Sequence, residues 1–134
     1  MRVPLFDFTR GMEPVRAIRR RTLKMILEAS KSQYPNEFAA MLKADKGVIK
    51  ELWLLPGTES GETSALFRLH MMPSEPKVVG TVHSHPSPSC RPSDADLDLF
   101  NRFGYCHIIV CEPFGMRSWA CYDGHGERRK LEVV

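Results

Sequence analysis

The segment that most constrains the fold is residues 80–100, GTVHSHPSPSCRPSDADLDLF, because it changes character twice within 21 residues. An apolar run ending in His83 and His85 is typical of a buried strand. Three prolines then follow within seven residues, which excludes a helix there and stiffens the connection. Ser93 is a good N-cap, so we expect a helix over residues 93–103, ended by Gly104. The segment therefore predicts a strand, a short stiff loop and a helix.

The spacing of polar residues in this segment predicts a metal site. Alternate side chains of a strand share a face, so His83 and His85 point the same way, with their imidazoles about 7 Å apart. On the helix, Asp96 falls on the apolar face with the leucine and phenylalanine side chains, whereas the other two aspartates lie about 160° away. An ionised carboxylate on an apolar face needs a partner. His83, His85 and Asp96 would give a zinc ion three ligands and leave a fourth position for water.

A simpler interpretation of part of this pattern is helix capping. Ser93-Asp94-Ala95-Asp96 fits the capping-box pattern, in which the side chains of Ser93 and Asp96 bond each other's backbone amides. Capping alone explains Asp96 without any metal, and an H-x-H pair also arises by chance. The combination of both histidines, the proline loop and the aspartate favours the metal site over either separate interpretation.

The rest of the chain predicts a single domain with a mixed sheet. Residues 1–13 look like an N-terminal extension, and the domain itself is expected over residues 14–134. A helix is predicted from Pro14 to residue 32, where Pro35 follows closely. Its buried face should carry Ile18, Thr22, Met25, Ile26 and Ala29. Strands are predicted over residues 38–43, 48–55, 64–71, 77–84, 105–111, 118–122 and 128–133, the last two as a hairpin. The order α-β-β-β-β-α-β-β-β belongs to an α/β fold with helices packed on the sheet.

Charge and hydropathy narrow the functional classes. Residues 1–24 carry seven basic and two acidic side chains, and the remainder carries 12 basic and 14 acidic ones, which together give the net charge of +3. The basic block is expected to be a solvated helix surface, with an acidic partner as the alternative. No apolar run is long enough to cross a bilayer, and the first residues lack a secretory signal. We therefore expect a cytoplasmic protein with no membrane partner.

The cysteines and one further histidine carry weaker signals. Cys90, Cys106, Cys111 and Cys121 form no C-x-x-C pair, so the sequence chooses neither a pairing nor the reduced state. Cys90 could be a fourth ligand, half of a disulfide or a buried thiol. His107 lies in a segment that is apolar on both faces, and it is expected to be a core histidine.

The pattern H-S-H-P-x6-S-x2-D, from His83 to Asp96, resembles the signature of the JAMM (MPN+) zinc metalloproteases. The resemblance runs from about Arg16 to the C-terminus, and it is strongest to short archaeal stand-alone enzymes of the desampylase type. It implies the MPN fold, a mixed sheet with helices like that of cytidine deaminases. It also implies one Zn²⁺ held by His83, His85 and Asp96. The helix KMILEASKSQYPNEF leads to Glu37, which resembles the catalytic glutamate of the family.

The same resemblance implies an activity. Glu37 would act as general base and Ser93 would hydrogen-bond the oxyanion or the substrate carbonyl, so that the enzyme hydrolyses isopeptide bonds between a ubiquitin-like modifier and a target lysine. Many members have cysteine and glycine where this chain has Ala39 and Ala40.

Alternative functions are a catalytically silent MPN interaction module and a RadC-type protein associated with nucleic acid. A deaminase is excluded because H-x-E with P-C-x-x-C is absent. Nucleic acid is not the expected partner, and homodimerisation is left open.

Overall fold

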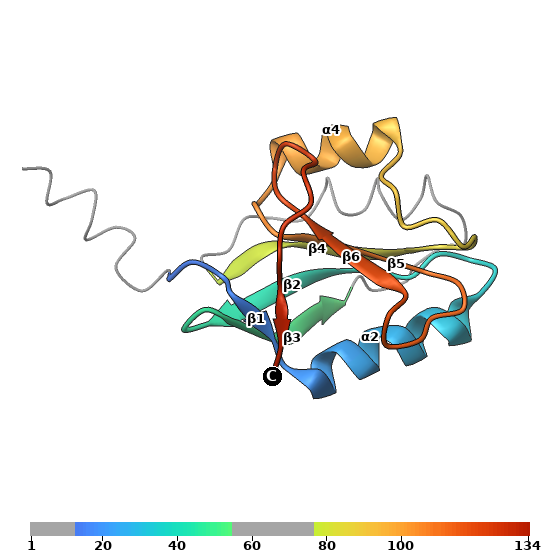
Figure 1. Ribbon diagram of the computed structural model, residues 1–134, viewed down its shortest axis with the longest axis horizontal. Coiled ribbons are helices and arrows are strands. Elements are labelled where there is room, and N and C mark those ends of the chain that lie inside the picture. The colour runs from blue at the N-terminus through green and yellow to red at the C-terminus, as the bar shows by residue number, and fades with distance from the viewer. Residues whose placement is uncertain (1–12, 55–76) are drawn as a thin grey trace, which may run out of the picture.

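The computed structural model describes residues 13–54 and 77–134. Within these ranges seven strands form one sheet in the order β6-β5-β4-β2-β3-β1-β7, and two helices pack against it. Figure 1 shows the sheet between the helices, with α4 on one face and α2 on the other. The predicted strand over residues 64–71 and nearly all of the predicted extension over residues 1–13 lie outside the described residues.

The elements follow the predicted order in most of the described chain. The strands are β1 (Ala17–Ile18), β2 (Ala39–Asp45), β3 (Val48–Leu54), β4 (Val78–His85), β5 (His107–Cys111), β6 (Trp119–Tyr122) and β7 (Glu132–Val133), and the helices are α2 (Arg20–Gln33) and α4 (Asp94–Arg102). β4 lies inside the sheet, next to its middle strand β2, and it pairs antiparallel with β2 and parallel with β5. A central strand with neighbours on both sides is a rigid place for functional side chains.

Two hydrophobic clusters cover the two faces of the sheet. The first packs α2 residues such as Leu23 and Ile26 against Ala40, Val82 and Ile108. The second packs Leu99 and Phe100 of α4 against neighbouring side chains of the opposite sheet face: Ala39, Met41, Ile109 and Ala120. Adjacent strand residues therefore point to opposite clusters, as the pleat requires. Val82 points to the α2 side, so His83 and His85, which alternate with Val82 and Ser84 along β4, face the α4 side.

The N-terminal part of the predicted helix is wrong. α2 begins at Arg20, with Arg19 as an N-cap in extended conformation, and Ala17–Ile18 form β1 between β3 and β7. Ile18 was predicted to lie on the buried face of this helix. Its side chain is buried, but it lies in β1. Met25 is also wrongly placed: it is 51% exposed, while Leu23, Ile26 and Leu27 are buried.

The predicted C-terminal hairpin forms only in part. Tyr122 and Arg128 make one antiparallel bridge, but β7 pairs in parallel with β1 at the opposite edge of the sheet. The chain therefore leaves β6 and crosses to the far side instead of returning along it. In the described ranges no helix has the length and apolarity needed to cross a membrane. The basic side chains of residues 16–24 are exposed, as expected for a solvated surface.

Candidate metal centre

The structure brings the three predicted metal ligands together. His83 and His85 come from the end of β4, and Asp96 comes from the first turn of α4. The Nε2 atom of each histidine lies 3.0 Å from a different oxygen of Asp96. One nitrogen or oxygen of each of the three residues lies within 4.8 Å of the other two. All three side chains are buried or nearly so, with Asp96 and His83 fully inaccessible.

Asp96 satisfies both interpretations of its sequence pattern. Its backbone N–H donates to Ser93 Oγ at 3.1 Å, and its Oδ2 accepts the Ser93 backbone N–H at 2.9 Å. The capping box therefore forms, and the same carboxylate still faces both imidazoles. Capping fixes the direction of the carboxylate at the start of the helix. The same carboxylate therefore both caps the helix and faces the two histidines, so the two interpretations of the sequence do not exclude each other.

The electrostatics of the cluster stabilise the Asp96 anion. Burial by itself raises the pKa of the Asp96 carboxyl, but the hydrogen bonds from His83 and His85, the charge of His83 and the Ser93 amide together lower it well below its usual value. Burial by itself lowers the pKa of His85, and the hydrogen bond and charge of Asp96 outweigh it, so the pKa is raised. The carboxylate is therefore ionised and available to a cation throughout the physiological range.

The orientation of His85 is set by the proline-rich loop. Its Nδ1 lies 3.1 Å from the carbonyl oxygen of Ser89. A carbonyl oxygen can only accept, so Nδ1 carries a hydrogen, and the hydrogen bond to Asp96 requires a second one on Nε2. A cation bound between His85 and Asp96 would replace the hydrogen on Nε2 and take up its lone pair. A partner on the other ring nitrogen is the usual means by which proteins orient a metal-binding histidine.

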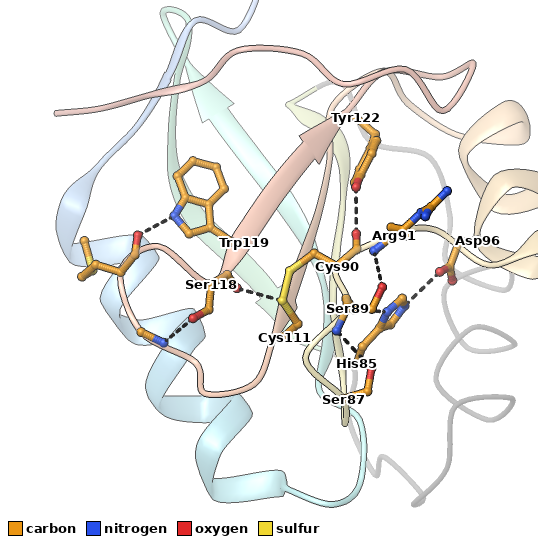
Figure 2. Close-up of a disulfide and its surroundings, with 12 residues drawn as sticks. His85, Ser87, Ser89, Cys90, Arg91, Asp96, Cys111, Ser118, Trp119 and Tyr122 are labelled. Atoms are coloured by element: carbon orange, nitrogen blue, oxygen red, sulfur yellow. Dashed lines mark hydrogen bonds and ion pairs between the residues drawn. A yellow bond between two sulfur atoms is a disulfide. The ribbon is translucent and has the colours of Figure 1, made fainter.

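A disulfide anchors the same loop to the sheet (Figure 2). Cys90 is bonded to Cys111 at the end of β5, opposite His85 in the sheet register. The Tyr122 hydroxyl donates to the Cys90 carbonyl at 2.8 Å. Of the three alternatives for Cys90, the structure selects the disulfide, so its sulfur is not a fourth ligand. Cys106 and Cys121 are buried thiols with their sulfur atoms 3.5 Å apart.

Glu37 lies close to His85, two residues before the start of β2. It is 2% exposed and lies just before the strand, whose Ala39 pairs with His83. The Ser84 backbone N–H donates to the Phe38 carbonyl, which extends the same antiparallel register and places Glu37 opposite His85. The negative charge of Glu37 contributes to the raised pKa of His85. Sequence reasoning reached Glu37 only through the family resemblance.

His107 is a core histidine, as predicted. It is fully buried, its Nδ1 lies 2.8 Å from Thr81 Oγ1, and its ring stacks on Phe100 at a centroid distance of 4.3 Å. Burial lowers its pKa to about 4, so the ring is neutral at physiological pH. It supports the sheet face beneath α4 and is not part of the metal cluster.

The donor set fits a zinc ion. Two imidazole nitrogens and one carboxylate oxygen are typical zinc ligands, and a set of three protein ligands is characteristic of catalytic sites. Asp96 is a buried anion between two imidazole rings. A divalent cation bound to all three side chains would balance its negative charge. In residues 13–54 and 77–134, this is the one group of three such side chains close enough to share an ion.

The fold and the site together define a class, that of α/β domains with an H-x-H…D metal centre between a central strand and a capping helix. The family model of prokaryotic homologues of the JAB domain matches residues 19–122. The chain therefore belongs to this JAMM/MPN family, and the resemblance that the signature indicated is confirmed.

Individual relatives agree with that assignment. A protein of Haloferax volcanii described as a probable metalloprotease is 38% identical over 122 residues, which cover 84% of this chain and 75% of the relative. A structure described as a JAMM metalloprotease-like zinc site in the proteasome and signalosome is 49% identical, with a TM-score of 0.72 over 90% of this chain and 98% of that one. A JAB1/MPN domain protein from Archaeoglobus fulgidus is 50% identical, with a TM-score of 0.71 over 89% and 96% of the two chains.

Proposed function

We propose that this protein is a zinc metalloprotease that hydrolyses isopeptide bonds between the C-terminal glycine of a ubiquitin-like modifier and a target lysine. The observation that carries the proposal is the buried cluster of His83, His85 and Asp96 with Glu37 opposite His85. The relatives add support, since one is described as a probable metalloprotease and another as having a metalloprotease-like zinc site. The modifier as substrate and the cytoplasm as location rest on the family resemblance and the composition.

The chain's own residues would hold the zinc ion and transfer the proton. His83, His85 and Asp96 would hold the zinc ion, which supplies Lewis acidity to a carbonyl oxygen and makes water more acidic. Glu37 accepts the proton of the attacking water and passes it to the lysine amine as the carbon–nitrogen bond breaks. The products are a free carboxylate on the modifier and a free amine on the target.

We infer that Ser93 stabilises the developing oxyanion. Its Oγ uses a lone pair to accept the Asp96 N–H at 3.1 Å, so the hydroxyl hydrogen can donate to the substrate carbonyl oxygen. Such a donor is effective because it stabilises charge that appears only in the transition state. Because the capping bond fixes the position of Oγ, the donor is oriented before the substrate binds.

The test is cleavage of a modifier joined to a lysine side chain, with and without a metal chelator. Glu37→Gln should retain one zinc per chain and lose turnover, because the amide cannot accept the proton. His83→Ala should lose both the metal and the activity. Glu28→Gln, which alters an exposed glutamate on α2, is the matched control and should behave as the wild type. Full turnover by the Glu37 variant would overturn the assignment of the base, and zinc binding without any cleavage would favour the silent interaction module.

A further inference from the structure

We infer that Ser84, the residue between the two histidines, is a positioning residue that sets the distance of Glu37 from the metal ligands. The inference rests on the proposed role of Glu37 as the base. Ser84 is buried, and its side chain points to the sheet face opposite the imidazoles of its neighbours. It therefore cannot act on the metal directly, and its effect must pass through the backbone that it contacts.

That backbone belongs to the residue next to Glu37. The Phe38 N–H donates to Ser84 Oγ at 2.8 Å, and the Ser84 N–H donates to the Phe38 carbonyl at 2.9 Å. Two hydrogen bonds between the same two residues fix both the separation and the rotation of one strand against the other. Regular pairing of β2 with β4 begins only at Ala39 and His83, so the side-chain bond extends the pairing one residue toward Glu37.

The position of Ser84 links the base to the ligands by the shortest covalent path. One peptide unit separates Ser84 from each histidine, and one separates Phe38 from Glu37. Without the hydroxyl, the Phe38 N–H would be buried and unpaired, because Phe38 is 6% exposed. An unpaired buried amide is costly, and the segment would shift to reach another acceptor. Displacement of a catalytic group by about 1 Å can cost about 100-fold in rate.

The test is Ser84→Ala, compared with Ser30→Ala. Ser30 is a matched control, because it is also a buried serine with a 2.8 Å hydrogen bond to the backbone, in this case to the Ile26 carbonyl within α2. We expect Ser84→Ala to lower kcat by about 10- to 100-fold with little change in KM, and to retain one zinc per chain. The Phe38 amide should exchange its hydrogen faster than in the wild type, while Ser30→Ala should leave kcat, KM, the zinc content and the Phe38 exchange rate unchanged.

Ser84→Thr restores a hydroxyl at the same position and should recover most of the lost kcat together with slow exchange at Phe38. If Ser84→Ala does not fold, Ser84→Cys keeps a side chain of similar volume with a weaker hydrogen-bond acceptor. This variant should also lose kcat, but by a smaller factor than expected for Ser84→Ala. Wild-type kcat in a folded Ser84→Ala or Ser84→Cys protein would overturn the inference while Glu37→Gln remains inactive. An active Glu37→Gln protein would instead overturn the proposed base itself.

Discussion

Acidification should destabilise the folded protein through His107. Burial lowers the pKa of this imidazole from 6.5 to about 4, and unfolding returns it to its ordinary value. Between these two pH values the unfolded chain binds more protons than the folded one, so stability is lost as the pH falls. One pKa unit corresponds to about 1.4 kcal/mol. The free energy of unfolding should therefore fall by about 2 kcal/mol near pH 5 and about 3 kcal/mol near pH 4, relative to neutral pH.

Urea unfolding of the wild type and of His107→Gln over this pH range measures the effect. A chelator should be present throughout, so that metal release does not contribute, and titration of the metal ligands then cancels between the two proteins. The stability difference between wild type and variant should shrink by the stated amounts as the pH falls. His125→Gln, which removes an exposed histidine, should follow the wild type. An unchanged difference between pH 7 and pH 5 would refute the argument that His107 is held neutral by burial.

Three further predictions concern packing and covalent structure. Cys90 and Cys111 are 21 residues apart, and chain entropy gives a disulfide that closes a loop of this size about 3 kcal/mol of stabilisation. Replacing both by serine should therefore lower the free energy of unfolding by about 3 kcal/mol, as measured by denaturant titration. Ile26→Ala should cost about 2–5 kcal/mol because its side chain is fully buried, whereas Met25→Ala, at an exposed position, should cost less than about 1 kcal/mol in the same assay. Gly80→Ala should yield little folded protein, as judged by circular dichroism and soluble yield, because a Cβ there would lie 1.7 Å from a backbone carbonyl oxygen of the segment leading into β5.

Local signals predicted the fold best where the deciding contacts are close in sequence. The start of α4 follows from Ser93 and Asp96, and its end follows from Gly104, which has a positive φ of 78°. β1 and β7 could not be found in this way, because each has two residues and exists only through pairing with the other and, for β1, with β3. For such short strands tertiary pairing decides the conformation, so helical spacing around Ile18 gave the wrong helix start.

The same distinction between local and long-range contacts explains which parts of the site could be predicted. Strand alternation and helix periodicity predicted that His83, His85 and Asp96 converge, since both rules act within one element. Placing Glu37 opposite His85 requires the register between β2 and β4, and joining Cys90 to Cys111 requires the register between β4 and β5. Neither register is encoded in the spacing of the residues concerned. The bond from Phe38 to Ser84 was missed for the same reason.

The double use of Asp96 has a practical consequence. Its carboxylate is oriented by the Ser93 amide and the neighbouring loop is covalently tied to β5, so the ligands converge in a scaffold assembled by protein contacts alone. Stripping the native ion should therefore leave a folded receptor rather than a collapsed chain. Cobalt(II) or cadmium can then be loaded under native conditions, which makes the coordination sphere accessible to optical and magnetic resonance spectroscopy without refolding.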